Sequence, residues 1–540
     1  MKIASWYVLI GVLGFTCACN SGSVLGTDDL GSGVDTPDGG IFDDAGAADA
    51  GPNVAPCMPG ESVLNPFPYS AMFGFPGLRD SVTGAAHVLP PAQPRTGTSR
   101  NIVSFGAKPD DGQDDRAAIQ SAIDASTSGD EVFIPKGLWN LSSTHPSSSQ
   151  TGTILQLKLK SGVNLRGEEQ ASAVLVSNLD CDSNCSNINQ FVIHGAGVSK
   201  LLLSDFTVTS TWNKTYSTDT NVSNPAVGGP AVAINLAGSG NAQDCFAISV
   251  ERVTAEKYSR MGFRANGGCH DVAFRSCLAQ NSTDVATGGA GYGFVLQGKT
   301  HQDPAAGSAP FADQYKNPFL GTPSDNYFNL IEGCRATGPY MRHGALVQYW
   351  SHHNAVTNST FENTQLDSID LHGDDEYSNE ISANVVLDNP GGAGIGMGNS
   401  GAGHDKTGAN NWVHHNLIRR SLRGISIQFG TAYSVVTNNC ILDNTATANG
   451  YGVGLGFAAR SVVQGNRVEG NTAAKFYGLY LFNDTSTGVS AAYRGSPANN
   501  LVDANLIKGN AFGIFAGTFG PQNTITNNQF IGNTMNNSYP

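Results

Sequence analysis

The sequence is poor in charge, since Asp, Glu, Lys and Arg together make up only 14% of its 540 residues. Acidic residues outnumber basic ones by 44 to 30, which gives a formal net charge of −14. A basic excess is what a protein needs to neutralise phosphates, so nucleic acid is excluded as the expected partner. Long helices with charged surfaces are also not expected, whereas 66 glycines favour short strands joined by tight turns.

A long apolar run is also missing. The run at residues 8–15 follows Lys2 and is too short to span a bilayer, as in an export signal. It is followed by Thr16-Cys17-Ala18-Cys19, which resembles a bacterial lipobox with Cys19 as the lipidated residue. We therefore expect an exported protein, either a lipoprotein of the bacterial cell surface or outer membrane or a secreted protein. Contact with the membrane is expected only through the lipid anchor.

The composition divides the chain into four segments. Residues 1–19 form the predicted signal peptide, and residues 20–56 are a low-complexity stretch of Gly, Ala, Asp, Ser and Pro that predicts a disordered linker. Residues 57–99 regain aromatic residues without a clear period, which predicts an extended lead-in packed on the main body. Residues 100–540 are the predicted main domain.

The main domain begins with a distinctive stretch. It contains Phe105-Gly106-Ala107, the acidic turn Asp110-Asp111-Gly112, and then Asp114-Asp115 before an apolar stripe formed by Ala118, Ile119, Ala122 and Ile123. The stripe predicts a helix that Asp114 or Asp115 can cap. With the following residues 132–137, this stretch resembles the N-terminal cap of the pectate lyase superfamily. The resemblance implies an all-β fold, a right-handed single-stranded parallel β-helix whose open end is closed by a helix.

Internal repeats favour the same fold. Alternating apolar residues end at a recurrent turn position, with a base period near 23–25 residues and insertions. The residues at this position are Cys277, Cys334, Ser359, Asn384, Asn416, Asn439, Asn466, Asn505 and Asn528. Stacked coils would bring them into one side-chain ladder, to which we assign a structural role.

The cysteines give a weaker signal. No CxxC or Cys/His spacing predicts a zinc site, and export permits disulfides. Cys181 and Cys185 flank a tight turn, and Cys245 and Cys269 are about one coil apart. The spacing alone does not fix which cysteines pair.

A second strand set, often introduced by Gly, lies between the ladder turns. Period-two alternation predicts one inward-facing set, namely Phe294, Leu296, Ala345, Val347, Ile369, Leu371, Ile395, Met397, Ile425 and Ile427. The intervening residues would form a polar strip with a glycine floor, suited to a polysaccharide. Its expected members are Gln297 and Lys299, Gln348 and Trp350, Asp370, His372 and Asp374, Gly396 and Gly398, Ser426 and Gln428, and Gly454 and Gly456. The long segment of residues 300–325 follows Lys299 and is predicted to form a wall of the cleft.

The densest cluster of functional residue types runs from Asp370 to Glu380, with five acids and His372. We predict that it is catalytic; a structural Ca²⁺ site and a solvated acidic turn are the alternatives. The expected catalytic residues are Lys299, Arg342, Asp370, His372, Asp374 and Asp375. The expected substrate-binding residues are Gln297, His343, Gln348, Trp350, Glu376 and Gln428. Ca²⁺ is the one cofactor considered, with Asp374, Asp375 and Glu376 as its ligands.

Four other histidines are predicted to lie outside the site. His352 and His353 fall at a turn and are expected on the surface, while His414 and His415 lie on the ladder strand and are expected to be structural. Residues 404–406 are expected in a loop over the cleft.

Three functions fit these residues. In β-elimination from a uronate, His372 or Lys299 would be the base, and Arg342 or Ca²⁺ would neutralise the substrate carboxylate. The Arg342-His343-Gly344 triplet resembles a motif of the chondroitinase- and alginate-lyase branch of the superfamily, which favours a polysaccharide lyase. In a glycoside hydrolase, Asp370 would pair with Asp374, Asp375 or Glu376. The third alternative is a polysaccharide-binding surface lipoprotein without activity.

Overall fold

The computed structural model describes residues 75–538, except for 82, 150–152, 181–188, 215–227, 241, 284–289, 299–323, 373–375, 399–408, 448, 474 and 486–494. The predicted signal peptide, Cys19, the linker, residues 57–74 of the lead-in, Cys181, Cys185, Lys299, nearly all of residues 300–325, residues 404–406, Asp374 and Asp375 lie outside the described residues. Within the described part, no helix is long and apolar enough to cross a membrane.

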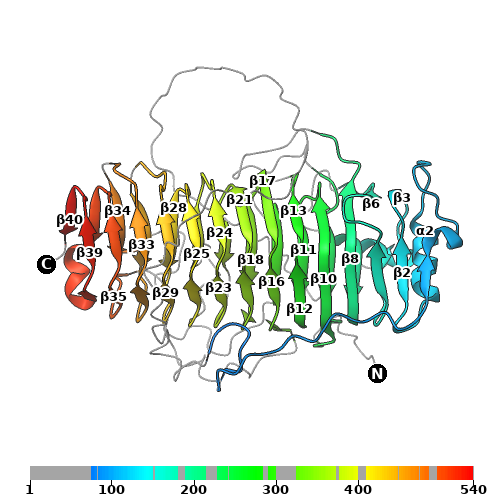
Figure 1. Cartoon of the computed structure of the whole chain (residues 1–540), viewed down its shortest axis with the longest axis horizontal. Coiled ribbons are helices and arrows are strands. Elements are labelled where there is room, and N and C mark those ends of the chain that lie inside the picture. Colours follow the sequence, from blue (N-terminus) through cyan, green and yellow to red (C-terminus); the bar gives the residue numbers. More distant parts are fainter. Residues whose placement is uncertain are drawn as a thin grey trace, which may run out of the picture.

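The main body is a right-handed parallel β-helix, as predicted, with its coils stacked along one long axis (Figure 1). One sheet has 13 parallel strands. They are β4 (Thr153–Lys158), β7 (Asn189–Ala196), β9 (Val232–Ala237), β11 (Met261–Asn266), β14 (Tyr292–Gln297), β18 (His343–Gln348), β22 (Ile369–Leu371), β25 (Ala393–Met397), β28 (Arg423–Gln428), β31 (Gly450–Gly456), β34 (Phe476–Phe482), β37 (Phe512–Phe515) and β40 (Met535–Ser538).

The second sheet has 27 strands in two rows. The first row is β1 (Ser99–Asn101), β2 (Glu131–Ile134), β5 (Asn164–Gly167), β8 (Ser199–Ser210), β10 (Cys245–Glu256), β12 (Cys269–Arg275), β16 (Leu330–Glu332), β20 (Ala355–Thr357), β23 (Glu380–Ser382), β26 (Trp412–His414), β29 (Val435–Thr437), β32 (Val462–Gln464), β35 (Leu501–Asp503) and β38 (Thr524–Thr526), with the short β15 (Asn326–Tyr327) and β19 (Ser351–His352). The second row is β3 (Gly137–Leu141), β6 (Ala173–Ser177), β13 (Leu278–Gln280), β17 (Arg335–Met341), β21 (Thr360–Thr364), β24 (Val385–Leu387), β27 (Leu417–Arg419), β30 (Cys440–Leu442), β33 (Arg467–Glu469), β36 (Leu506–Lys508) and β39 (Gln529–Ile531). The long β8 and β10 run through both rows and join them.

The N-terminal end is closed by the predicted helix, α2 (Arg116–Ala125), next to the 3-10 helix η1 (Ile102–Phe105). Ile119, Ala122 and Ile123 are buried, which confirms the apolar stripe. The predicted cap is divided between the two acids. The Asp114 carboxylate accepts the Arg116 N–H at 3.2 Å, while that of Asp115 holds the loop by accepting the Lys108 N–H at 2.8 Å. Two further 3-10 helices are η2 (Pro146–Ser149) and η5 (Gly517–Gln522).

The predicted ladder is confirmed inside the coils. In each step from Asn384 to Asn528, an Asn side-chain oxygen accepts the backbone N–H of the residue one coil before, at 2.9–3.0 Å. The ten residues expected to face inward on the thirteen-stranded sheet are all buried in the core. The ladder satisfies polar groups that the stacked turns would otherwise leave without partners in the interior.

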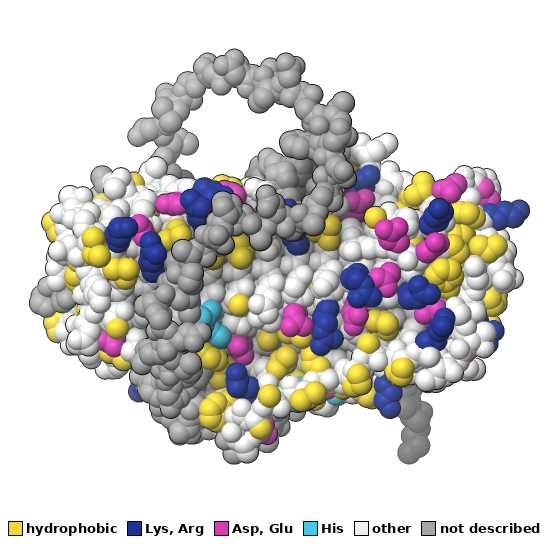
Figure 2. Space-filling view, viewed as in Figure 1, with side chains coloured by type: hydrophobic (Ala, Val, Ile, Leu, Met, Phe, Trp, Pro, Cys, Tyr) yellow, Lys and Arg dark blue, Asp and Glu magenta, His cyan; other side chains and the backbone are white. Residues whose placement is uncertain are grey.

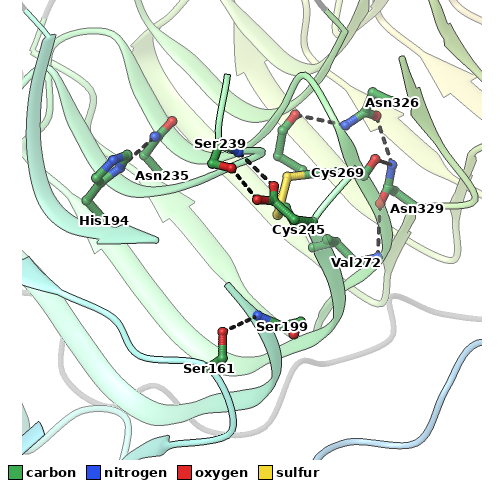
Figure 3. The surroundings of a disulfide bond; sticks show 12 residues. Ser161, His194, Ser199, Asn235, Ser239, Cys245, Cys269, Val272, Asn326 and Asn329 are labelled. Carbon is green, nitrogen blue, oxygen red and sulfur yellow. Dashed lines mark hydrogen bonds between the residues drawn. A yellow bond between two sulfur atoms is a disulfide. The ribbon is translucent and has the colours of Figure 1, made fainter. Parts of the chain in front are cut away.

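Four cysteines lie on coils before the Asn ladder begins. Cys245 and Cys269 pair in register between β10 and β12 and form a disulfide (Figure 3). Cys277 and Cys334, which begin the predicted ladder, are buried free thiols. Their neighbours Leu278 and Arg335 are in register, so the two thiols lie on adjacent coils.

The described part of the lead-in packs along the 27-stranded sheet. His87 stacks on Phe328 at 4.0 Å between ring centroids and contacts Asp271 through its Nε2 at 2.5 Å. Leu78 and Leu89 pack against an apolar cluster on the same sheet. Figure 2 shows acidic and basic side chains interspersed over one face of the body.

A bend interrupts the alternation near the start of the strands of the thirteen-stranded sheet. A Cβ on Gly344 would meet the buried ring of Phe361 at 2.4 Å from its nearest carbon, so Gly344 faces inward, and the next residue, Ala345, is also buried in the core. Two consecutive inward positions place the residue before the glycine, His343, on the outer face. Gly424 repeats this arrangement against Ile441, which places Arg423 on the outer face as well.

Candidate functional site

The candidate site lies on the outer face of the thirteen-stranded sheet, centred on Asp370 in β22. The register of the strands places Leu346 one coil before Asp370 and Gly396 one coil after it, and then Ser426 and Gly454. Adjacent coils are ~4.8 Å apart, so these positions form a continuous column. Asp370 and His372 face outward together, as the alternation predicts.

Two histidines approach Asp370 from different coils. His343 Nε2 and His372 Nδ1 each lie 3.7 Å from Asp370 Oδ2. The other ring nitrogen of His343, Nδ1, is 2.6 Å from the carbonyl oxygen of Asp367 and must donate a hydrogen to it, because a carbonyl oxygen only accepts. Neutral His343 therefore presents a lone pair toward Asp370, and one proton can be shared among the three side chains.

Asp367 is a second acid in the site. A Cβ built on Gly396 would collide with Asp367 Oδ2 and lie 3.3 Å from Asp370 Oδ1, so both carboxyls converge over this glycine. The Asp367 carboxylate also accepts the N–H of Ala393 at 2.6 Å. Glycine is required at position 396, because a side chain there would occupy the space in which the two acids meet.

The surroundings disfavour the charged forms of the central groups. Burial, followed by the charge of Asp367, raises the pKa of Asp370 well above its usual range, although Arg342 opposes the shift. Burial also raises the pKa of Asp367, against its hydrogen bond from Ala393 and the charge of Arg423. Burial, together with the charge of Arg342, lowers the pKa of His343 well below its usual range. A protonated acid beside a neutral imidazole is suited to proton transfer.

Cationic and phenolic groups flank these acids. Arg342 is 6% exposed. On the other side, the Arg423 guanidinium lies 5.6 Å from the centroid of the Tyr451 ring. The Tyr451 hydroxyl lies 3.0 Å from the Ser426 hydroxyl and accepts a hydrogen bond from Gln428 at 2.9 Å. Burial raises the pKa of Tyr451, so its phenol stays protonated at neutral pH.

The predicted polar strip is interrupted on its N-terminal side. Gln297 and Gln348 pair in register as expected, and both are half-buried. Gln297, however, accepts hydrogen bonds from Arg264 at 2.8 and 3.1 Å. The column next to them is Val295 and Leu346, which are buried in a separate apolar cluster on the outer face. The prediction of one unbroken polar strip was therefore wrong, because it left out the outward-facing apolar residues Val295 and Leu346.

Two expected substrate-binding residues are placed elsewhere. Trp350 lies at the turn after β18, with φ of 46°, and packs against the buried cluster of Tyr377, Ala409, Ala432 and Tyr433. Glu376 is fully buried and accepts the N–H of Tyr349 at 3.1 Å, so it holds that turn together. The prediction that these two residues line the open polar strip is corrected, because both belong to the turn, while Glu376 as a ligand of Ca²⁺ stays a prediction.

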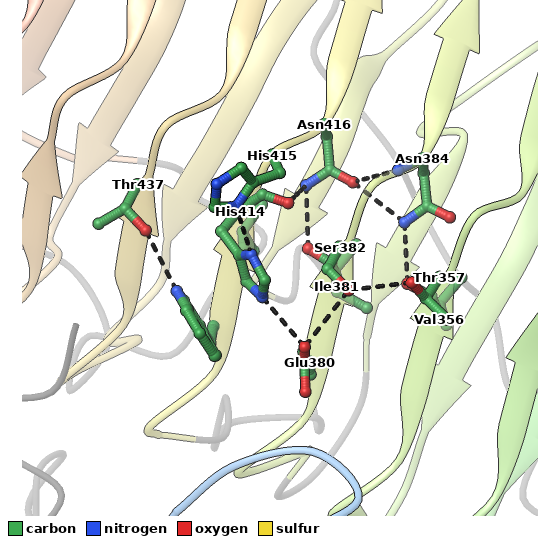
Figure 4. Close-up of polar contacts among 12 residues, drawn as sticks. Val356, Thr357, Glu380, Ile381, Ser382, Asn384, His414, His415, Asn416 and Thr437 are labelled. Atoms are coloured by element: carbon green, nitrogen blue, oxygen red, sulfur yellow. Dashed lines mark hydrogen bonds and ion pairs between the residues drawn. The ribbon is translucent and has the colours of Figure 1, made fainter. Parts of the chain in front are cut away.

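The four histidines predicted to lie outside the site are on, or directly beside, strands of the 27-stranded sheet. His352 and His353 are 1% and 0% exposed, so the prediction that they lie on the surface was wrong. His352 is held between the rings of Tyr327 and Tyr377. His414 contacts Glu380 at 3.1 Å and stacks on Trp412, a structural arrangement on the ladder strand (Figure 4).

No group of three or more His, Cys, Asp or Glu side chains able to hold a metal is found among the described residues. Asp374 and Asp375 are outside that part of the chain, so the expected Ca²⁺ site remains a prediction.

The alternation rule missed three residues of the site: Asp367, Arg423 and Tyr451. The glycine bend places Arg423 and Tyr451 on the outer face, although strict alternation would turn them inward. The signal in the sequence was the recurrent glycine followed by an inward apolar residue, as in Gly424-Ile425 and Gly452-Val453. The residue before each such glycine faces outward.

Two family models match the body, one to each half. Residues 99–303 match rhamnogalacturonase A/epimerase, pectate lyase-like, and residues 328–540 match NosD, a periplasmic copper-binding protein. These matches confirm the resemblance to the pectate lyase superfamily. Comparison with curated protein sequences gives no match.

Three solved structures illustrate the similarity. The A-module of mannuronan C-5 epimerase AlgE6 of Azotobacter vinelandii is 16% identical over 82% of this chain and 96% of its own, with a TM-score of 0.49. The surface protein and adhesin PfbA of Streptococcus pneumoniae is 13% identical over 81% and 98%, with a TM-score of 0.47. An alginate lyase of Paenibacillus sp. is 13% identical over 73% and 99%, with a TM-score of 0.40. At these values the similarity does not extend to activity.

Proposed function

We propose that this protein is a carbohydrate-active enzyme, and that it acts as a polysaccharide lyase on a uronate-containing chain. The observation that carries the proposal is the position of Asp370 Oδ2, 3.7 Å from both His343 Nε2 and His372 Nδ1. Such spacing is too long for a direct hydrogen bond but is typical of catalytic groups before substrate binds.

His372 is our candidate for the base. Its side chain is 20% exposed, against 7% for His343 and for Asp370, so it is the member of the three that a substrate reaches most easily. Because Nδ1 faces Asp370, a proton held on Nδ1 makes Nε2 the basic atom, and Asp370 fixes this orientation. Lys299, outside the described residues, is the alternative base.

The elimination would proceed as follows. The base removes the proton from the carbon beside the uronate carboxylate. The C–O bond to the neighbouring sugar then breaks, and a double bond forms between the carbon that lost the proton and the carbon that carried this oxygen. Arg342, which is 6% exposed and whose charge acts on Asp370, is our candidate to neutralise the carboxylate as charge develops on it. Tyr451, whose phenol stays protonated, is the candidate donor of a proton to the departing oxygen.

One observation favours a hydrolase as the second candidate. Asp367 and Asp370 converge over Gly396, and burial raises the pKa of both. Two carboxyls of which one is protonated are the requirement of glycoside hydrolysis, with one as general acid and the other as nucleophile or base. In this mechanism the histidines would position the acids and take no part in proton abstraction.

The test is to incubate the purified protein with a panel of uronate-containing and neutral polysaccharides, with Ca²⁺ or with EDTA. New reducing ends and the ultraviolet absorbance of an unsaturated uronate are followed together. Both signals rising would support the lyase. Reducing ends alone would support the hydrolase, and binding without either signal would leave a polysaccharide-binding protein.

Variants then separate the two mechanisms. His372→Gln should reduce lyase turnover by roughly 10²–10⁴-fold, whereas hydrolysis should depend more on Asp367→Asn. His415→Asn is a matched control, because His415 is an exposed histidine on the other sheet with φ of 57°, a conformation that Asn tolerates. Full activity in His372→Gln, with His415→Asn equally active, would exclude His372 as the base.

A further inference from the structure

The outer column that contains Asp370 changes character toward the C-terminal end. After Gly396, Ser426 and Gly454, the register continues with Tyr480 in β34 and Phe515 in β37. Tyr480 is thus four coils from Asp370, about 19 Å along the axis at ~4.8 Å per coil. The two glycines between them are covered by neighbouring side chains, Gly396 by Asp367 and Gly454 by the ring of Tyr451.

Neighbouring columns contribute more rings at the same coils. We call this group the aromatic platform; it consists of Tyr477, Tyr480, Phe482, Phe512 and Phe515. Tyr477 and Tyr480 stack with centroids 4.3 Å apart, and Tyr480 and Phe482 stack at 4.8 Å. All five rings are half-buried, so each retains an accessible part.

The platform is continuous with the candidate site. Tyr451, whose hydroxyl contacts Ser426 and Gln428, stacks on Phe482 at 5.9 Å and lies 6.3 Å from the ring of Tyr480. In the opposite direction, the column next to Asp370 is Leu346 and Val295, which are 1% and 0% exposed. Among the described residues, Tyr and Phe side chains therefore continue this column only on the C-terminal side of Asp370.

We infer that the aromatic platform binds the sugar rings of the polysaccharide that lie on the C-terminal side of the site. The rings stack on one another, so their outward edges form one apolar surface against which the C–H face of a pyranose ring can pack, and rings on successive coils would receive successive sugars. The inference rests on the proposed function and adds to it the direction of the bound chain. It also predicts that short substrates, which do not reach the platform, are bound more weakly than long ones.

The experiment compares four variants on one polysaccharide that the protein cleaves and on a length series of its oligosaccharides. Tyr480→Ala and Phe515→Ala remove platform rings, Tyr480→Phe keeps the ring, and Phe246→Ala removes a half-buried stacked ring from the other sheet as the control. Tyr480→Ala should raise KM about three- to tenfold with kcat unchanged. Phe515→Ala should do so only for longer oligosaccharides, and the other two variants should behave like the natural protein.

Equal KM values for Tyr480→Ala, Phe515→Ala and the natural protein on every length would overturn the inference while leaving the proposed function intact. If no polysaccharide is cleaved, affinity electrophoresis on the same panel replaces the kinetics. Retardation that Tyr480→Ala loses and Tyr480→Phe keeps would support the platform and refute the enzyme. Absence of both cleavage and retardation would overturn both.

Discussion

The two sheets of this β-helix use their outer surfaces in different ways. On the 27-stranded sheet, similar side chains stack coil after coil, as in the column Phe246, His270, Tyr327, His352 and Tyr377, with ring centroids 4.6–5.4 Å apart. On the thirteen-stranded sheet, each coil around Asp370 presents a different residue type.

The difference indicates that functional residues lie where the side chains do not repeat from coil to coil. Repetition lets each side chain be satisfied by its copy on the next coil, as it does for the internal Asn ladder. Asp370, in contrast, has Leu346 and Gly396 as neighbours, and burial raises its pKa. A charged or protonated group without repeated partners costs stability, so its presence points to a functional role.

The largest effect on activity is expected for a substitution of Asp370, the residue without a repeated partner. Asp370→Asn should lower turnover by roughly 10²–10⁴-fold in either mechanism. The same change should not lower the melting temperature at neutral pH, because the folded state disfavours the ionised carboxylate. Thermal unfolding and kinetics on the same preparation check both halves, and a large loss of stability would mean that Asp370 is a structural residue.

For the Asn ladder, in contrast, a substitution is expected to lower the stability of the fold. Asn439→Ala removes the acceptor of the Asn416 N–H at 3.0 Å and the donor to the Val413 carbonyl at 3.0 Å. Leaving such buried groups without partners should lower the free energy of unfolding by about 3 kcal/mol. Denaturant unfolding measures it. Asn528→Ala, at the more exposed end of the ladder, is the control and should cost less.

A pH dependence should mark the N-terminal part of the thirteen-stranded sheet. Burial is the main cause that lowers the pKa of His194 to about 4. The unfolded chain, with a pKa near 6.5, then binds the proton first, so the free energy of unfolding falls as the pH drops from about 6.5 to about 4, by about 2–3 kcal/mol. His194→Gln should flatten this part of the stability profile. An unchanged profile would refute the assignment.

The smallest effect is expected for the ion pairs of the 27-stranded sheet. Arg252 contacts Asp205 through both Nε and Nη2, at 2.6 and 3.0 Å, but its side chain is half exposed. Arg252→Gln should therefore change the free energy of unfolding by at most about 1 kcal/mol. A larger loss in denaturant unfolding would show that repeated surface pairs act as a network.

Much of this architecture could be predicted because it repeats. The ladder turns, the inward apolar residues and the capping helix each follow from periodicity or local pairing. The site followed less completely. Asp370, His372, Arg342 and His343 were named, but alternation gave no account of how His343 reaches Asp370, since the inward-facing Gly344 reverses the side on which it lies.

The sequence by itself determined the coil, because period-two alternation and a recurrent Asn at the turn depend only on neighbours along the chain and one coil away. Only the tertiary structure decided which polar residues meet. Trp350 and Glu376 lie at a turn outside the site. The site instead contains Asp367, Arg423 and Tyr451. For Arg423 and Tyr451 the physical reason is that two consecutive inward residues at a glycine change the direction of a side chain without changing the periodic pattern of the sequence, and for the residues at turns it is that alternation does not apply there.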